Sequence, residues 1–347
     1  MSTWELLAEL PLQIEGYTLE PRQALVSSDF ERKSTVIRRT GAGSEGLGED
    51  VTYDAVDQEI AQQAGPTLAL AGSFTLASFA DRLSELALFP EPPQREVSER
   101  YRRWAYESAA LDLALSQAGS TLHAILGREP EPVRFVVSLR LGEPPSMEPV
   151  NSRLERYPTL HFKLDPTSSW DETLIAELVA TGAVDSVDFK GLYVGSVVDQ
   201  PADPLLYARV AEAFPHAWIE DPALTEETDA VLAAHRERFS WDASIHSIED
   251  IKALPYPPRM VNIKPSRLGG LRNLLDAYDY CAERGIGNYG GGQFELGVGR
   301  SQNQYLASLF HGDAPNDVAP TGFNLPDPPP GLPSSPLAPA PPASGFH

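Results

Sequence analysis

From about residue 133 the chain repeats one pattern, in which short β-rich runs alternate with stretches of helical periodicity. The β-rich runs are 133–139, 159–164, 186–191, 217–222, 239–244, 260–265, 286–291 and 316–321. A helix between each pair of runs favours right-handed βα units and a parallel sheet. Eight such units predict an α/β fold with a closed (β/α)8-type barrel over residues 131–324, and an open doubly wound sheet is the alternative.

The two ends of the chain follow other patterns. Residues 15–26 and 32–40 resemble antiparallel strands, and residues 98–127 form a long, interrupted helical region. Residues 1–130 are therefore expected to form an α+β domain that precedes the barrel. Residues 325–347 hold nine prolines, a composition that favours polyproline II or irregular chain. We expect this Pro-rich C-terminal segment to pack back on the protein.

The charge balance limits the partners of the chain. Its 49 acidic residues against 27 lysines and arginines give a formal net charge of −22. A field of that sign disfavours nucleic acid and anionic membranes as partners. We find no run of 18 apolar residues and no signal peptide at the start of the sequence. The single cysteine, Cys281, excludes a disulfide within the chain, and a cytoplasmic location is expected.

Lysine is rare in this chain: of its 27 lysines and arginines, 22 are arginines. The five lysines are Lys33, Lys163, Lys190, Lys252 and Lys264. Arginine cannot give up its proton, whereas lysine can when its surroundings lower its pKa. A lysine in such a sequence therefore indicates a position where a titratable amine was needed.

Five charged residues lie at the ends of successive predicted strands. They are Lys163, Asp188, Glu220, Asp242 and Lys264, separated by 25, 32, 22 and 22 residues. Barrel active sites form at the carboxyl ends of the strands, where different strands each supply a residue. The three acids lie on neighbouring strands, so their carboxylates are expected to converge on one point. A carboxylate set with open positions suits a hard cation such as Mg²⁺, with Mn²⁺ as a second choice.

The two lysines of this set come from the second and sixth predicted strands, which face each other in an eight-membered ring. Lys163 and Lys264 would therefore flank one substrate from opposite sides. In that arrangement one lysine removes a proton next to a substrate carboxylate as a general base. The metal offsets the charge that develops as an enediolate forms. The opposite lysine either returns a proton or stabilises the intermediate.

At these residues the sequence resembles the enolase superfamily, in particular its muconate-lactonizing subgroup. Lys163 matches the second lysine of the subgroup's Lys-x-Lys. Asp188, Glu220 in WIEDP and Asp242 in WDAS match its metal ligands, and Lys264 in NIKPSRLGGL matches its sixth-strand lysine. The segment GGGQFELGVGR (290–300) is similar to the seventh-strand region, which places Glu295 near the site. The likeness extends to residues 46–50 and 107–127, and covers most of 20–324.

The resemblance implies a Mg²⁺-dependent lyase or isomerase that acts on a small-molecule carboxylate. It implies a cycloisomerase, an o-succinylbenzoate-synthase-type dehydratase or a racemase, an N-terminal domain that caps the barrel mouth, and a homo-oligomer. Two positions depart from the family pattern: His161 stands in place of the first lysine of Lys-x-Lys, and Lys190 in place of an asparagine. With Glu295, these two residues are the expected substrate contacts. The sequence also lacks the eighth-strand Asp-x-Asp of dipeptide epimerases.

Two other functions were weighed. A catalytically silent Mg²⁺-binding scaffold on the same fold is favoured only by the two departures, His161 and Lys190. A metal hydrolase built on a (β/α)8 barrel would usually recruit histidine ligands, whereas all of the ligand positions here are carboxylates. The leading expectation is therefore an enzyme that abstracts a proton α to a carboxylate.

Overall fold

The computed structural model describes residues 2–26, 30–196 and 198–347. The first part of the chain forms a three-stranded antiparallel sheet in the order β2-β3-β4 and a two-stranded pair, β1 with β5. The strands are β1 (Pro11–Ile14), β2 (Gly16–Val26), β3 (Phe30–Gly41), β4 (Ser44–Asp50) and β5 (Gly72–Thr75). The helices are η1 (Trp4–Leu6), α1 (Ala55–Ala64), α2 (Leu76–Ser84), α3 (Ser98–Gln117) and α4 (Leu122–Leu126).

Helix α3 lies directly on β4, and two glycines of that strand make this possible. A Cβ atom at Gly46 would lie 2.3 Å from the backbone nitrogen of Leu113, and one at Gly48 would lie 2.1 Å from the backbone oxygen of Ala105. No side chain fits in that space, so only glycine lets helix and strand approach this closely. The contact buries most of α3, from Tyr101 to Leu115.

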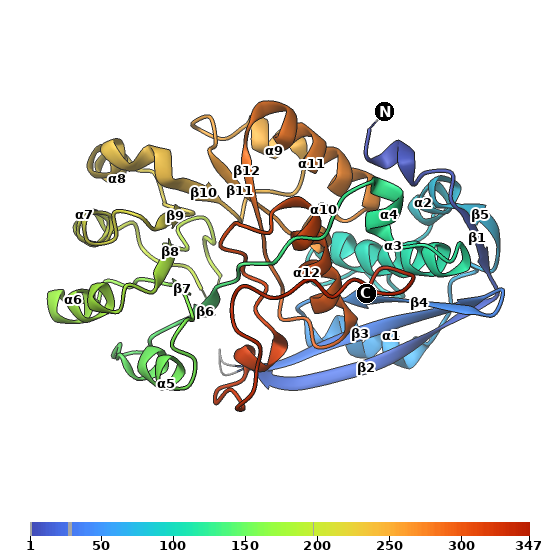
Figure 1. Ribbon diagram of the computed structural model, residues 1–347, viewed down its shortest axis with the longest axis horizontal. Coiled ribbons are helices and arrows are strands. Elements are labelled where there is room, and N and C mark those ends of the chain that lie inside the picture. Colours follow the sequence, from blue (N-terminus) through green and yellow to red (C-terminus); the bar gives the residue numbers. More distant parts are fainter. Residues whose placement is uncertain (1, 27–29, 197) are drawn as a thin grey trace.

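The second part of the chain forms a curled, parallel sheet of seven strands in the order β12-β11-β10-β9-β8-β7-β6 (Figure 1). The strands are β6 (Val137–Leu139), β7 (Phe162–Leu164), β8 (Val184–Asp188), β9 (Trp218–Glu220), β10 (Phe239–Trp241), β11 (Met260–Ile263) and β12 (Gly287–Gly290). Each lies within or overlaps one of the first seven predicted runs. The α/β class and the parallel order of these runs are therefore confirmed.

Helices follow the strands and cover the outside of the curled sheet (Figure 1). They are α5 (Glu148–Arg156), α6 (Glu172–Thr181), α7 (Pro204–Ala213), α8 (Glu226–Leu232), α9 (Ile248–Lys252), α10 (Pro265–Leu268), α11 (Leu271–Arg284) and α12 (Val298–Phe310), with η2 (Ala233–Arg238) and η3 (Thr321–Asn324). Side-chain caps start several of them: Asp171 accepts a hydrogen bond from the Leu174 amide, and Thr225 from the Thr228 amide. Such caps satisfy amides that the first helical turn leaves free.

The eighth predicted run, 316–321, forms no ladder in the described part of the chain. Asn316 makes a single bridge to Phe135, and Asp317 makes one to Gly291, next to the opposite edge of the sheet. Prolines at 315 and 320 bound this stretch and remove amide donors. The Asn316 side chain bonds instead to the backbone oxygens of Arg134, His311 and Ala314, and accepts from the Gly290 amide.

Glu49 and the Pro-rich C-terminal segment both connect the two parts of the chain. Glu49 of β4 accepts hydrogen bonds from the amides of Leu296, Gly297 and Gly299, around the start of α12. In the Pro-rich segment, Leu337 pairs with Val133, and Phe346 is buried against Trp104 and Tyr305. We propose to keep the division into 1–130, 131–324 and 325–347. Among the described residues, no helix is both long enough and apolar enough to cross a membrane.

Candidate functional site

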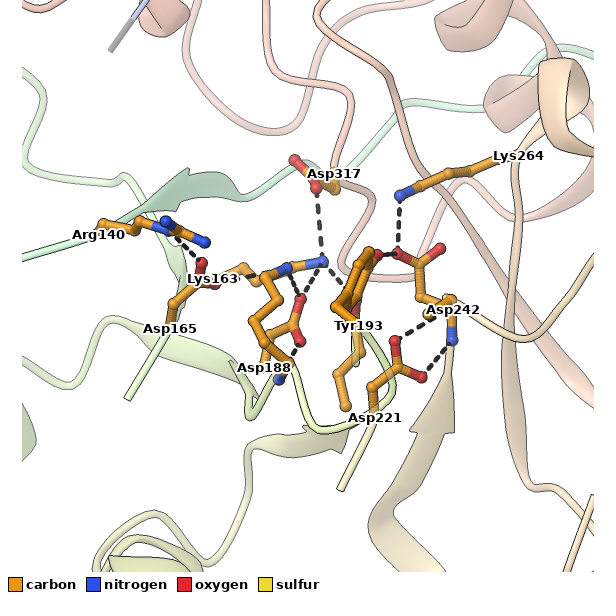
Figure 2. A network of polar contacts seen from close by, with 12 residues as sticks. Arg140, Lys163, Asp165, Asp188, Tyr193, Asp221, Asp242, Lys264 and Asp317 are labelled. Carbon is orange, nitrogen blue, oxygen red and sulfur yellow. Dashed lines mark hydrogen bonds and ion pairs between the residues drawn. The ribbon is translucent and has the colours of Figure 1, made fainter. Parts of the chain in front are cut away.

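The five charged residues that the sequence singled out lie at the same edge of the parallel sheet. Lys163 is in β7, Asp188 and Glu220 end β8 and β9, and Asp242 and Lys264 directly follow β10 and β11. Asp188 pairs in register with Glu220, and paired residues of a parallel sheet point to the same face. All five side chains are buried. Figure 2 shows Lys163, Asp188 and Asp242 turned toward one another, with Lys264 and Asp317 above them.

Lys163 lies among three carboxylates. Its Nζ is 2.5 Å from Glu220 Oε1, 3.1 Å from Asp188 Oδ2 and 3.6 Å from Asp317 Oδ2. Burial alone would lower the pKa of this ammonium, but Glu220 and Asp188 outweigh that effect and raise the pKa well above its ordinary value. Lys163 is therefore held as a cation by the acids around it.

Lys264 is in a different electrostatic setting. Its Nζ is 2.7 Å from Asp242 Oδ2, while Arg267 Nη1 is 2.8 Å from Asp242 Oδ1. Burial lowers the pKa of Lys264, Asp242 opposes this, and the positive charges of Arg267 and Lys163 lower it further. The net shift is downward, opposite to that of Lys163. The two lysines therefore differ in how readily each gives up its proton.

The carboxylates that come closest together are only partly those expected. Ligand oxygens of Asp188, Glu220 and Asp221 all lie within 4.8 Å of one another. Asp242, the expected third member, is not in this group, because Lys264, Arg267 and the Tyr193 hydroxyl all contact its carboxylate. Asp221 instead accepts hydrogen bonds of 2.8 Å from the amides of Asp242 and Ala243.

These donors suit a divalent cation. All are carboxylate oxygens, which hard cations prefer. Glu220 Oε2 is buried and has no hydrogen-bond partner among the described residues. Burial raises the pKa of Glu220 well above its ordinary value even though Lys163 opposes it, and burial with repulsion from Asp242 and Asp188 raises the pKa of Asp221 to about 7. A cation would relieve this repulsion, so the acidic cluster fits a metal ion, whose identity the donors do not specify.

Lys190 is the one expected substrate contact that joins this network. Its Nζ contacts Asp188 Oδ2 and lies 3.7 Å from Asp165 Oδ1. Asp165 also pairs with Arg140, whose Nε is 3.0 Å from Asp165 Oδ2. Lys190 therefore links the carboxylate cluster to a second ion pair, that of Asp165 with Arg140, which Figure 2 shows next to Asp188 and Lys163.

His161 and Glu295 lie elsewhere. His161 Nδ1 is 2.8 Å from Asp185 Oδ1, and the pairing of β7 with β8 shifts register between Phe162 and Lys163. The extra residue at this shift is Asp185 of β8, whose carboxylate is the partner of His161. Glu295 accepts from the Gln293 amide and the Asn303 side chain and pairs with Arg300, 2.9 Å away. Neither side chain contacts the lysines within the part of the chain that is described.

Several site residues were not predicted. Asp165, Tyr193, Asp221 and Asp317 all contact members of the cluster. The spacing offered a signal for Asp165, which is two residues beyond Lys163 and so on the same side of the strand. Buried polar atoms without partners among the described residues also lie on the inner strands, in Ser186, Ser240, Asn262 and Tyr289. This polar interior is typical of a site that holds water or a polar ligand.

Comparison with known proteins agrees with this architecture. A model described as the C-terminal domain of the domain of unknown function DUF8230 matches residues 129–325, and its N-terminal-domain model matches residues 5–125. The o-succinylbenzoate synthase of Geobacillus stearothermophilus is 31% identical over 229 residues, which are 62% of this chain and 58% of the relative. An N-succinylamino acid racemase of Amycolatopsis is 28% identical over 313 residues, covering 83% of this chain and 79% of the relative. The matches span between 58% and 62% of the first three curated relatives.

The fold also has solved counterparts. Muconate lactonizing enzyme from Pseudomonas putida has a TM-score of 0.63 at 18% identity, with 88% of each chain covered. A structure described as a member of the enolase superfamily is similar as well. The expected resemblance is thus confirmed, and the relatives that the sequence matches are named enzymes. The chain belongs to the family described as domain of unknown function DUF8230; its sequence is similar to those of o-succinylbenzoate synthases and N-succinylamino acid racemases, and its fold is similar to that of solved members of the enolase superfamily.

Proposed function

We propose that the chain abstracts the proton α to a carboxylate of a small-molecule substrate, through an enediolate, with Mg²⁺ as the expected cofactor. The observation that carries this proposal is the placement of two buried lysines. Lys163 and Lys264 lie four strands apart in the sheet, and the strands between them supply Asp188, Glu220 and Asp242. With an acid–base group on each side of a centre lined by carboxylates, a proton can be removed from one face of the substrate and returned to the same face or to the opposite one.

Asp188, Glu220 and Asp242 are the proposed metal ligands, with Asp221 as the alternative third ligand. The partners of the Asp242 carboxylate are side chains, which can move away. Both carboxylate oxygens of Asp221, by contrast, accept hydrogen bonds from backbone amides. We therefore assign Asp221 the role of positioning the Asp242 backbone. When bound, the cation would offset negative charge on the substrate carboxylate as the α-proton leaves.

The chain itself positions both lysines. Lys163 is held by Glu220, Asp188 and Asp317, the last of which lies above it in Figure 2. Lys264 lies against Gly291, where a Cβ atom would come within 2.4 Å of Lys264 Cε. Because Gly291 has no side chain, there is space for the Lys264 side chain to extend into the site. We infer that residues 316–317 take the place of the eighth barrel strand and carry Asp317 to the rim.

The test is deuterium exchange. The protein would be incubated in D₂O with Mg²⁺ and a panel of N-succinylamino acids, cyclohexadiene-type succinyl acids and muconates, and mass spectrometry would follow α-deuterium or a new product. We expect Mg²⁺-dependent exchange that falls at least about a thousandfold in Lys264→Ala and Lys163→Ala, because each removes an acid–base group. Lys252→Ala, at an exposed lysine paired only with Glu249, is the matched control.

One observation favours a second candidate, the silent metal-binding scaffold. The cluster already contains four cations that pair with its carboxylates: the buried Lys163, Lys264 and Arg267 and the half-buried Lys190. A protein that binds the metal through Glu220 but leaves every panel member unchanged would favour this candidate. The homo-oligomeric state and the cytoplasmic location remain predictions.

A further inference from the structure

The turn after β8 points a lysine back at the strand it leaves. Lys190 adopts a positive φ of 54°, and its backbone amide donates to Asp188 Oδ1 at 3.1 Å. Its Nζ folds over to contact the other oxygen of the same carboxylate, Asp188 Oδ2. A left-handed conformation is unfavourable for a lysine, so packing must impose it. Gly191 supplies that packing. Its amide donates to the backbone carbonyl oxygen of Asp221 at 3.0 Å, and a Cβ atom at this position would lie 2.3 Å from the backbone nitrogen of Ala223.

The same turn reaches a second carboxylate. Tyr193 donates its hydroxyl to Asp242 Oδ2 at 2.9 Å, and Lys190 Nζ lies 5.2 Å from the centre of the Tyr193 ring. We call residues 190–193 the capping turn. It places an ammonium on one proposed metal ligand, Asp188, and a hydroxyl, that of Tyr193 in Figure 2, on another, Asp242. The turn therefore occupies the oxygens that a divalent cation would need.

A vacant acceptor lies next to the ammonium. Asp165 Oδ1 is 3.7 Å from Lys190 Nζ, buried, and without a hydrogen-bond partner among the described residues. Its other oxygen, Oδ2, is held by Arg140 Nε at 3.0 Å. A buried carboxylate oxygen without a partner is unfavourable, so a short movement of the ammonium onto it would be stabilising.

We propose that Lys190 is a resident counterion that competes with the divalent cation for Asp188, and that Asp165 takes up its ammonium when the cation binds. This inference rests on the proposed function, since it assumes that Asp188 is a metal ligand. An ammonium and a metal ion on one carboxylate oxygen repel each other at contact distance, so each weakens the binding of the other. Lys190 therefore offsets negative charge of the site without metal and lowers its affinity for metal.

Metal binding itself provides the test. Mn²⁺ would be titrated into the full chain, with free Mn²⁺ followed by its electron paramagnetic resonance signal. We expect Lys190→Met to bind Mn²⁺ at least about tenfold more tightly, since it removes a charge-assisted contact that the metal must displace. Arg140→Met is the matched control, because it removes a nearby cation that pairs with Asp165 but not with Asp188. The Mn²⁺ affinity of Arg140→Met should change by less than about threefold if the effect of Lys190 comes from its direct contact with Asp188 rather than from long-range charge.

Asp165→Asn keeps the inference testable if Lys190→Met folds poorly, because it leaves Lys190 in place and can be measured alone. Asp165→Asn should weaken Mn²⁺ binding about tenfold, although Asp165 is not a proposed ligand, and this loss should disappear when Lys190→Met is also present. Affinity in Lys190→Met equal to or weaker than in the unmodified chain, or an undiminished Asp165→Asn effect in the double variant, overturns the inference. Glu220→Gln separates the two proposals: if Mn²⁺ binding survives this change, the metal site of the proposed function is wrong.

Discussion

The cations of the site at the edge of the parallel sheet and Arg39 in the antiparallel half are neutralised in different ways. At the edge of the parallel sheet, Lys163, Lys190 and Lys264 each pair with carboxylates. In the antiparallel half, Arg39 of β3 is fully buried, and none of its three side-chain nitrogens has a hydrogen-bond partner among the described residues. Its guanidinium instead lies over aromatic rings, 4.6 Å from the centre of Phe79 and 5.3 Å from that of Tyr106.

The difference separates a site from a scaffold. Ion pairs between side chains can be exchanged for a metal or a substrate carboxylate, because the new charge replaces the old one. A cation held by ring faces has no such exchange, and Arg39 is surrounded by core residues. Burial lowers the pKa of Arg39 to about 10, so it remains a cation near neutral pH. The contrast suggests that the acids beside the lysines are maintained for chemistry, whereas Arg39 is maintained by packing.

The largest expected effect comes from removing a paired cation. Lys163→Met leaves Glu220 and Asp188 facing each other in a buried site without their shared ammonium. We expect the free energy of unfolding without metal to fall by about 3–5 kcal/mol, and Mg²⁺ to restore part of it by replacing the lost charge. Urea denaturation with and without Mg²⁺ would measure both. Lys252→Met, at an exposed pair, should change stability by less than about 0.5 kcal/mol, and an equally small loss at Lys163 would remove the contrast.

An intermediate effect is expected from a buried acid between the two halves. Glu107 of α3 accepts the Leu271 amide at 2.7 Å, and its nearest cation, Arg103, is 3.7 Å away. Burial raises the pKa of Glu107 from 4.5 to about 7, despite the Leu271 amide and Arg103, which lower it. Between these values the folded chain holds a proton that the unfolded chain has lost, so stability should fall as pH rises from about 4.5 to 7.

Glu107→Gln isolates this contribution, because glutamine keeps the acceptor for the Leu271 amide but does not titrate. The stability of the variant relative to the unmodified chain should rise by up to about 3 kcal/mol across that pH range. Denaturant midpoints at several pH values would measure it. A difference that stays constant with pH would mean that Glu107 is neutralised by its surroundings, like the acids of the site.

The sequence could predict the location of those site residues that lie at the ends of regularly spaced strands. Lys163, Asp188, Glu220, Asp242 and Lys264 lie at successive strand ends, so a parallel sheet must bring them to one edge. Tyr193 and the inward turn of Lys190 depend on a left-handed residue and on packing at Gly191, which a strand–helix pattern does not encode. His161 pairs with Asp185, the residue that the register shift adds to β8, and a regular strand pattern does not encode such a shift. The eighth run contributes only isolated bridges, since prolines flank Asn316 and Asp317.

The smallest expected effect comes from replacing Arg39, the buried cation that has no carboxylate partner among the described residues. Arg39→Met removes a buried charge that has no carboxylate to leave behind, and it keeps an unbranched apolar chain among the rings. The relieved desolvation of the buried charge exceeds the lost cation–π attraction, so we expect stability to rise by about 1 kcal/mol. Arg102→Met is the matched control in the same half: Arg102 also lies over a ring, that of Phe89, but it pairs with buried Asp50 at 2.8 Å. That change should cost about 3 kcal/mol, because Asp50 stays buried and unpaired. If thermal or urea unfolding showed equal losses for the two arginines, ring contacts rather than acids would decide what a buried cation contributes in this protein.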